Sequence, residues 1–256
     1  MARVKFLNTY IDSLTMGEAV HTIDRLIDRR NCAYVVTPNL DHIVTLEADQ
    51  EFAEIYKNAD LILADGKPLI WISRLLGCPI REKISGSDLF PRVCAMAAQR
   101  GHSIFILGAA EGVAAKAAEN LKEKNPGLRV TGVYSPPVGF EQNPKELCKI
   151  AEIIKAAKPD ILAVSLGSPK GEKFIYRHLK EYEVPLGISI GATIDFEAGN
   201  VKRAPGWISN MGFEWLFRIT QDPQRLIKRY WNDAIKILPI IKKYKQAGGK
   251  TYENTN

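Results

Sequence analysis

The sequence lacks any long hydrophobic run. Of its 256 residues 46% are hydrophobic, which is ordinary for a globular protein, and no stretch approaches the roughly 20 apolar residues that a membrane-spanning helix needs. The first residues, MARVKFLNTYIDSLT, also lack the apolar core and small-residue cleavage site of a signal peptide. We therefore expect a cytosolic protein, built as one large domain or as one domain with an appendage.

Cysteine and histidine are scarce and scattered. The four cysteines form no C-x-x-C pair, and the four histidines show no ligand spacing. The sequence also contains no P-loop or H-E-x-x-H motif, and its one G-x-S-x-G segment, residues 187–191, falls within an expected strand rather than at a strand-to-helix turn. These absences disfavour disulfides, zinc chemistry and covalent catalysis, so we expect reduced, structural thiols.

Positive charge is missing from most of the chain and concentrated at its end. Residues 1–200 carry 24 Lys and Arg against 25 Asp and Glu, a net charge of −1, whereas residues 201–256 carry 11 against 4, a net charge of +7. A nearly neutral body with a basic tail predicts an anionic partner for the tail, such as a membrane, a nucleic acid or a phosphorylated ligand.

Short apolar runs alternate with helical patterns through the first 200 residues. Expected strands cover residues 33–39, 61–65, 103–108, 129–135, 161–167 and 185–191, and expected helices cover residues 40–59, 67–77, 87–101, 111–127, 144–159 and 169–182. Strands alternating with helices of this length form βαβ units. The sequence therefore predicts a Rossmann-like α/β domain over residues 1–200, with a largely parallel sheet and helices on both faces.

Residues 201–256 show no strand pattern and are typical of a basic, helical, amphipathic appendage. A helix is expected from Pro223, kinked or split at Pro239. Its apolar face carries Ile227, Tyr230, Trp231, Ala234, Leu238 and Ile241, and its polar face carries Lys228, Asn232, Lys236 and Lys243. This composition fits a helix lying in a membrane interface, and fits equally a terminal helix packed on the body.

Asp65 ends the apolar run LILAD and precedes Gly66, Lys67 and Pro68. Such a carboxylate can cap the next helix, whose first turn would hold the proline. It can also belong to a ligand site, because ligands of open α/β sheets bind beyond the carboxyl ends of the strands. Polar or glycine-rich clusters follow five expected strands, at residues 37–39, 65–66, 108–112, 167–171 and 191–195. Their convergence on one sheet edge favours a ligand site.

The segment SIFILGAAEGV, with Gly108 and Gly112, joins an expected strand to an expected helix. Such a turn can place backbone N–H groups against phosphate, although a plain tight turn explains it as well. It is not the G-x-G-x-x-G fingerprint of dinucleotide-binding proteins. We expect a phosphorylated ligand, with Asp65 as a general base and cations or N–H groups that stabilise a departing phosphate.

Six segments of the chain occur together in a characteristic order. They are TPNLDH, ADGKPLIWISRLLGCPIREKISGSDLF, FILGAAEGV, PDILAVSLGSPKGEKFI, GATIDFEAGNVKRAP and GFEWLFRITQDPQRLIKRY. Over about residues 5–230 the sequence thereby resembles the WecG/TagA/CpsF family of bacterial glycosyltransferases. The resemblance implies inverting transfer of a sugar, typically N-acetylmannosamine or its uronic acid, from a UDP-sugar donor. The implied acceptor is a polyprenyl-diphosphate-linked sugar at the inner membrane face, in the synthesis of teichoic acid or other cell-surface polysaccharides.

The resemblance also implies roles for individual residues. Asp65 is the expected base, with Thr37 and Asn39 beside the reacting sugars. Tyr134 and Asp195 are candidates for holding the nucleotide. The remaining expected binding residues, for phosphates, lipid diphosphate or leaving group, are Lys83, Gly108, Gly167, Gly171, Arg203, Arg218, Arg225 and Arg229. No metal or other cofactor is expected, which agrees with the absence of a D-x-D motif.

Two positions depart from the family pattern. Lys83 stands where the family usually has Arg, so the charge is kept but the two-pronged guanidinium is lost. Gly171 stands where the family usually has Gln, so an amide donor and acceptor are lost. Because Thr37, Asn39 and Asp65 are all present, these changes favour a different donor sugar over an inactive protein.

Two other functions compete with sugar transfer. A nucleotide-binding enzyme of another class, such as an oxidoreductase, is disfavoured by the missing dinucleotide fingerprint. A non-catalytic protein could bind nucleic acid through the basic tail, but the Trp- and Tyr-containing apolar face fits lipid better, so no nucleic-acid partner is expected. We expect a protein peripheral to the membrane, and the family analogy also allows a homo-oligomer whose interface exchanges with docking of the tail.

Overall fold

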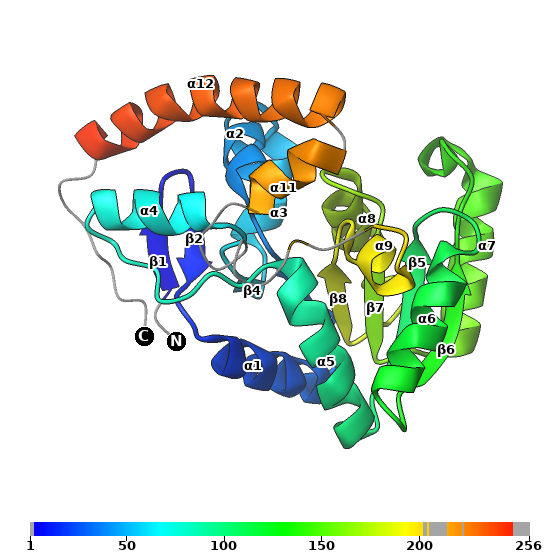
Figure 1. The fold of residues 1–256 in the computed structure, drawn as a ribbon. Coiled ribbons are helices and arrows are strands. Elements are labelled where there is room, and N and C mark those ends of the chain that lie inside the picture. Colours follow the sequence, from blue (N-terminus) through cyan, green and yellow to red (C-terminus); the bar gives the residue numbers. More distant parts are fainter. Residues whose placement is uncertain (1–2, 202–203, 205–213, 222, 248–256) are drawn as a thin grey trace.

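The computed structural model describes residues 3–201, 204, 214–221 and 223–247. Its main sheet has six strands, all parallel, in the order β4-β3-β8-β7-β5-β6 (Figure 1). The strands are β3 (Ala33–Val36), β4 (Leu61–Ile62), β5 (Ser103–Gly108), β6 (Arg129–Tyr134), β7 (Ile161–Ser165) and β8 (Leu186–Ser189). The predicted α/β class is confirmed, and all six strands lie where the apolar runs placed them.

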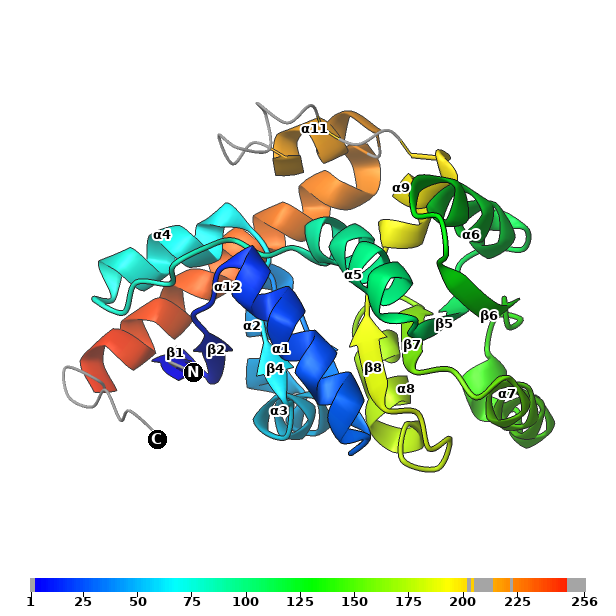
Figure 2. The same cartoon turned by 90° about the horizontal axis from the view of Figure 1, so that it is seen from below.

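Helices cover both faces of this sheet (Figures 1 and 2). One face packs against α2 (Leu40–Ala48), α3 (Gln50–Lys57), α7 (Pro144–Ala157) and α8 (Lys170–His178), and the other against α1 (Met16–Arg29), α5 (Gly86–Arg100), α6 (Val113–Lys124) and α9 (Thr193–Ala198). Successive side chains of a strand point to opposite faces. Val36 therefore joins the first core and Val35 the second.

The N-terminal segment forms structure that the sequence did not reveal. It consists of the antiparallel hairpin β1 (Arg3–Phe6) and β2 (Thr9–Asp12), followed by α1. The Asp12 carboxylate accepts hydrogen bonds from the Arg3 guanidinium at 2.8 Å and from the backbone N–H of Ile62 at 2.9 Å. This one carboxylate ties the hairpin to β4. A capping box formed by Thr15 and Glu18 starts α1.

The prediction of a single helix over residues 40–59 is wrong, because the helix is interrupted at Asp49 and two helices form. Asp49 ends α2 in an extended conformation, and its carboxylate accepts the backbone N–H of Phe52 at 2.9 Å, which caps α3. The remaining elements of the body are α4 (Lys67–Leu75) and the short 3-10 helix η1 (Phe140–Gln142).

The tail contains α11 (Glu214–Gln221) and α12 (Pro223–Ala247), and α12 packs against α2 (Figure 1). Of the two outcomes predicted at Pro239, the split is wrong, because α12 continues through it, and the kink stays a prediction. Its buried face carries Leu226, Ile237 and Ile240, of which the last two join the core of the body. The proposed domain boundary at residue 200 stays a prediction. Among the helices of the described residues, none has both the length and the apolar composition to cross a membrane.

Candidate active site

Asp65 lies beside the loop that follows β3. The Asp65 backbone N–H donates to the carbonyl oxygen of Pro38 at 2.8 Å, and the Leu63 N–H donates to Val36 at 3.0 Å. The two segments therefore run side by side past the ends of β3 and β4. Because Thr37 and Asn39 flank Pro38, the structure brings together the three residues expected to be catalytic. Their catalytic roles stay a prediction.

Asp65 does not cap the helix that follows it. The N-cap of α4 is Gly66, and no side chain makes a capping hydrogen bond there. Gly66 has a φ of +107°, which side-chain-bearing residues rarely adopt. The helix-cap alternative for Asp65 is therefore wrong, and the convergence of strand ends is the better account of its position.

The first turn of α5 lies against the same strand ends. A Cβ placed on Gly86 would be 3.4 Å from the Thr37 hydroxyl oxygen and 3.8 Å from the carbonyl oxygen of Ile190. The backbone N–H of Ile84 donates to the carbonyl of Ala64 at 2.8 Å. Backbone N–H groups at the start of a helix attract anions. The ends of β3, β4 and β8 therefore face a helix end suited to phosphate.

Lys83 supplies a cation just before α5. Its ammonium group lies 2.7 Å from the Asp88 carboxylate in the first turn of α5, and its side chain is largely buried. The Ser85 hydroxyl caps the same helix by accepting the backbone N–H of Asp88 at 3.2 Å. The chain thus fixes one lysine beside the amide end of α5.

Behind Asn39 lies a buried polar network that the sequence did not single out. His42 faces Asn39 on one side and Glu172 on the other, and Ser189 donates to Glu172. Burial alone would raise the pKa of the Glu172 carboxyl, but His42 and Ser189 lower it below its ordinary value. The signals available in the sequence were slight: His42 is three residues after Asn39, and Glu172 follows Gly171.

Two of the predicted glycines, Gly108 and Gly167, lie at the ends of β5 and β7, and the third, Gly171, lies in the first turn of α8. A Cβ on Gly108 would be 2.3 Å from the carbonyl oxygen of Ser165, so glycine is required where β5 meets β7. A Cβ on Gly171 would be 3.0 Å from the Ser189 hydroxyl oxygen. Gly167 has a φ of +72° in the turn before α8. Ligand binding at these glycines stays a prediction.

Tyr134 is not brought to Asp65. It ends β6, at the opposite edge of the sheet from β4. Five strand spacings of about 4.8 Å separate those edges, which amounts to about 24 Å. The Tyr134 hydroxyl donates to Glu146 of α7, and Lys149 lies 4.8 Å from the centre of its ring. A role for Tyr134 in holding the nucleotide stays a prediction and requires a ligand that extends along the sheet edge.

Asp195 lies on α9, directly after β8, and burial raises the pKa of its carboxyl. The tail arginines are less fully placed. Arg203 lies outside the described residues, and so do the side chains of Arg218 on α11 and Arg225 on α12. Arg229 of α12 is described, and its buried Nε has no hydrogen-bond partner within the described part of the chain. Binding by any of these residues stays a prediction.

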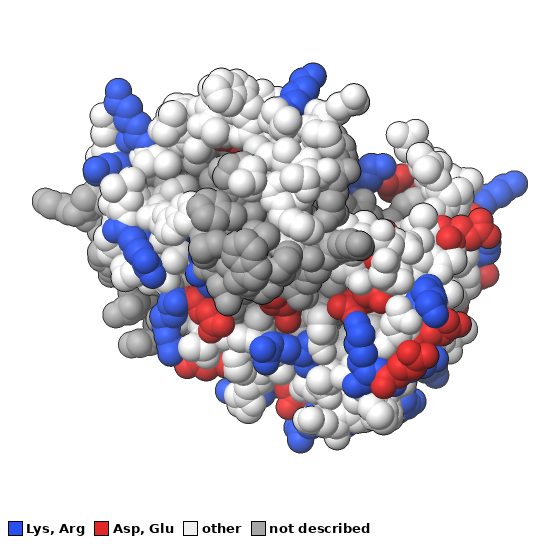
Figure 3. Space-filling model, viewed as in Figure 1, with Lys and Arg blue, Asp and Glu red and all other residues white. Residues whose placement is uncertain are grey.

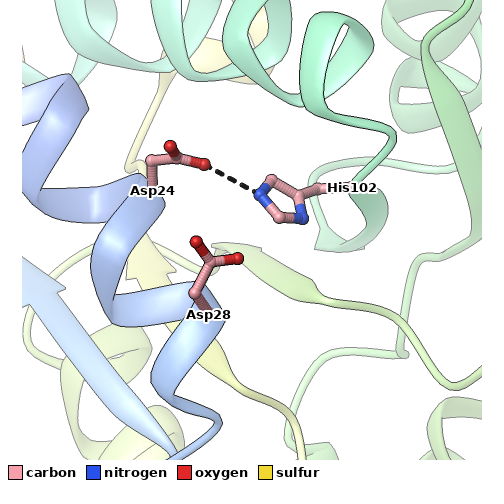
Figure 4. A group of neighbouring side chains, drawn as sticks. All are labelled: Asp24, Asp28 and His102. Carbon is pink, nitrogen blue, oxygen red and sulfur yellow. Dashed lines mark hydrogen bonds and ion pairs between the residues drawn. The ribbon is translucent and has the colours of Figure 1, made fainter.

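One further cluster lies at the other end of the sheet, where β5 begins. Asp24 and Asp28 of α1 approach His102, and the Asp24 carboxylate lies 2.9 Å from the imidazole (Figure 4). Arg100 already neutralises this group, at 3.0 Å from Asp24 and 3.6 Å from Asp28. The cluster is a salt-bridge network remote from Asp65.

Comparison with known proteins agrees with this geometry. The family model described as "Glycosyl transferase WecG/TagA/CpsF family" matches residues 4–250. Three relatives carry the name N-acetylglucosaminyldiphosphoundecaprenol N-acetyl-beta-D-mannosaminyltransferase. The protein of Bacillus subtilis strain 168 is 31% identical over 94% of this chain and 90% of its own length. That of Bacillus spizizenii strain W23 is 29% identical over 95% and 91%, and that of Staphylococcus aureus strain MW2 is 27% identical over 97% and 94%. The chain therefore belongs to the WecG/TagA/CpsF family of glycosyltransferases.

Proposed function

We propose that the protein transfers an N-acetylmannosamine-type sugar, or a related uronic acid, from a UDP-sugar to a polyprenyl-diphosphate-linked N-acetylglucosamine. The observation that carries this proposal is the position of Asp65. It does not cap α4, and it is hydrogen-bonded through its backbone to the loop between Thr37 and Asn39. The names of the relatives supply the sugar and the acceptor.

The proposed reaction is a single displacement with inversion at the sugar. The Asp65 carboxylate takes the proton of the acceptor hydroxyl, and that oxygen forms a bond to the anomeric carbon as the bond to the UDP oxygen breaks. Negative charge grows on the departing diphosphate. Lys83 and the first turn of α5 lie near enough to the same strand ends to stabilise that charge. We propose that these groups do so without a divalent cation.

The transfer assay tests this directly. The protein is incubated with a short-chain polyprenyl-diphosphate-N-acetylglucosamine and a panel of UDP-sugars, with and without EDTA, and product mass is followed. We expect a gain of one sugar in both conditions and a loss of about 10²- to 10⁴-fold in rate for Asp65→Asn, because a general base contributes about that much.

The control for the transfer assay is Asp28→Asn, which removes an exposed carboxylate far from the strand ends. This variant should keep the wild-type rate. Full activity in Asp65→Asn would disprove the base assignment, and no product from any UDP-sugar would disprove the proposed reaction.

We propose further that α12 holds the enzyme on an anionic membrane. Its outward face exposes Ile227, Trp231, Ile235 and Leu238, and Trp231 is 68% exposed. In both ribbon views α4 lies alongside, and it exposes Trp71 and Leu75. Figure 3 shows this upper part of the molecule as mostly uncharged, with Lys and Arg at its rim. An apolar stripe beside basic residues suits the interface of an anionic bilayer.

Co-sedimentation with anionic liposomes tests the proposed membrane face. Trp231→Glu with Ile235→Glu should release the protein, because charges then replace the apolar contact. The matched control is Val138→Glu, since Val138 is a fully exposed apolar residue on the loop after β6. Point variants are preferable to removing residues after 200, because truncation also uncovers the core that Ile237 and Ile240 cover. Unchanged sedimentation of the double variant would show that this stripe is not the anchor.

A further inference from the structure

His42 and Glu172 form a buried ion pair directly behind Asn39. The imidazole Nε2 lies 3.5 Å from Glu172 Oε1, and the two side chains are only 8% and 4% exposed. Ser189 donates its hydroxyl proton to the same carboxylate oxygen at 3.0 Å. A buried carboxylate is costly unless it is paired and hydrogen-bonded. The burial of this charged pair beside Asn39 therefore suggests a role in the candidate active site.

The other side of the imidazole holds the Asn39 amide. The ring Nδ1 lies 2.7 Å from Asn39 Oδ1, and the His42 backbone N–H donates to the same oxygen at 3.2 Å. The Asn39 backbone N–H also points at Nδ1, but at the longer distance of 3.3 Å, so the 2.7 Å contact with Oδ1 is the stronger one. An amide has one oxygen and one NH₂ group. With the oxygen held by His42 through two contacts, the NH₂ group of Asn39 points away from His42.

Both ring nitrogens of His42 face oxygen acceptors, Asn39 on one side and Glu172 on the other. A neutral imidazole carries one N–H and would leave the other nitrogen's lone pair against an oxygen. An imidazolium donates from both nitrogens. Among the described residues, Tyr56 of α3 packs against the imidazole, and Asp41 of α2 pairs with Asp233 of α12, which Arg229 and Lys236 of α12 also face. These charges are of both signs, so the two ring contacts carry the assignment.

We propose that His42 and Glu172 are positioning residues that make Asn39 a hydrogen-bond donor toward the reacting substrates. The imidazolium donates Nδ1–H to Asn39 Oδ1 and Nε2–H to Glu172, which fixes the amide with its NH₂ turned to the substrate side. The substrate atom that receives it is an oxygen, of a sugar hydroxyl or of the diphosphate. This inference rests on the proposed function, because it assumes that Asn39 meets those substrates.

Tyr56 of α3 packs beside the ion pair, with its ring centre 6.4 Å from that of His42. It is fully buried, and among the described residues neither its hydroxyl nor Glu172 Oε2 has a hydrogen-bond partner. Burial first, and then the charges of Glu172 and Asp65, raise the pKa of the Tyr56 hydroxyl.

Nitrogen NMR of the full chain tests the charge state without any assay of activity. Long-range ¹H–¹⁵N spectra resolve the four histidines, and His42→Gln assigns the His42 signals by their loss. We expect both ring nitrogens of His42 to show imidazolium shifts, because each nitrogen faces an oxygen, Asn39 Oδ1 at 2.7 Å and Glu172 Oε1 at 3.5 Å. Glu172→Gln should convert them to the neutral pattern. A neutral His42 in the wild-type protein would overturn the proposal.

Kinetics test whether the pair acts through Asn39. Glu172→Gln keeps the shape of the side chain and should lower kcat about 10- to 100-fold, with KM for the UDP-sugar changed less than threefold, because a misplaced donor costs rate. In Asn39→Ala, adding Glu172→Gln should cost no further activity. Additive losses would mean that Glu172 acts elsewhere and would overturn the proposal.

A matched control is a second histidine–carboxylate pair among the described residues, the largely buried His102 and Asp24. Asp24→Asn should lower thermal stability about as much as Glu172→Gln and leave kcat within twofold of the wild type. An equal loss of kcat in both variants would mean that Glu172→Gln acts only by lowering stability, and it would refute a positioning role for Glu172. If the wild-type protein transfers no sugar, the proposed function fails, and the NMR result still decides whether His42 and Glu172 form the proposed ion pair.

Discussion

At Gly171 a neighbouring hydroxyl crowds the place of a side chain. The family resemblance implies glutamine at that position, yet a Cβ there would lie 3.0 Å from the Ser189 hydroxyl oxygen, closer than most real contacts. That hydroxyl is the one that donates to Glu172. A side chain at position 171 would therefore displace the Ser189 hydroxyl and, through it, disturb the hydrogen bond to the buried Glu172 carboxylate.

Restoring glutamine tests this coupling between Gly171 and Ser189. Gly171→Gln alone should destabilise the protein by roughly 1–3 kcal/mol, as overpacking of a core does. Combining it with Ser189→Ala should recover part of that loss, because the clashing oxygen is gone. Thermal melts of the two variants and of Ser189→Ala measure the coupling, and strictly additive changes in stability would contradict it.

Single residues also show what could be foreseen from the sequence. The convergence of residues 37–39 and 65–66 was predicted because each group follows an apolar run, and the ends of parallel strands share one edge. The choice of Thr37 and Asn39 within the first group came from the family resemblance. His42 and Glu172 were not, because 130 positions separate them and nothing local marks a pair that forms through space. The placement of Tyr134 at the far edge of the sheet could not be predicted for the same reason, because strand order depends on pairing between segments that are distant in the sequence.

Among the elements, α2 and α3 depend on a single side chain at their junction. Asp49 caps α3, and its carboxylate also lies 2.5 Å from the Lys173 ammonium group of α8. The hydrogen bond from Lys173, followed by that from the Phe52 backbone, lowers the pKa of Asp49. The stability gained from this lowered pKa is therefore present above the unfolded pKa of about 4 and is lost as the pH falls.

Two substitutions separate the cap at Asp49 from the charge. Asp49→Asn keeps an oxygen that can cap α3 and loses the ion pair, whereas Asp49→Ala loses both. We expect Asp49→Ala to cost about 1 kcal/mol more than Asp49→Asn, the usual contribution of an N-cap. Both should reduce the acid sensitivity of stability between about pH 5 and pH 2. Equal urea midpoints for the two variants would show that the cap contributes nothing.

Element boundaries were predictable where glycines and apolar runs mark the ends of an element. The predictions failed where contacts with distant parts of the chain determine the element. The helix ending at Gly101 and the strands over residues 103–108 and 161–165 follow their sequence signals. The hairpin β1–β2 was missed because its strands are short and gain their order from Asp12, which bonds to β4. The apolar face predicted for α12 is largely its exposed face, because Leu226, Ile237 and Ile240 form the packed one.

For the whole molecule, the pH dependence of the packing of α12 on the body is set by a pair of carboxyl groups. Asp233 of α12 is only 4% exposed and hydrogen-bonds to Asp41 of α2. Burial, together with the charge of Asp41, raises the pKa of Asp233 to about 6. A raised folded-state pKa gives stability that is complete below the unfolded pKa of about 4 and is lost as the pH rises through about 6. Docking of α12 should therefore weaken toward neutral pH.

Asp233→Asn tests the pH dependence of tail docking. The amide can still hydrogen-bond to Asp41 and carries no charge, so α12 should stay docked at pH 7.5 as firmly as at pH 5. Hydrogen exchange of the α12 backbone amides, corrected for intrinsic rates, measures the free energy of opening of this helix. From pH 5 to pH 7.5 that free energy should fall by roughly 1–2 kcal/mol in the wild type and stay constant in Asp233→Asn. The exposed Asp28→Asn serves as control, and a wild-type helix with pH-independent protection would refute the link.

The position of β8 has a consequence for the chain as it is made. β8 is the last strand of the sheet in sequence, yet it lies between β3 and β7. Until residues 186–189 leave the ribosome, β4–β3 and β7–β5–β6 can form only as separate pieces, each with an apolar edge open to other chains. Synthesis must therefore run nearly to completion before the two pieces join, and the strand ends that carry Asn39 and Glu172 meet only at that late step.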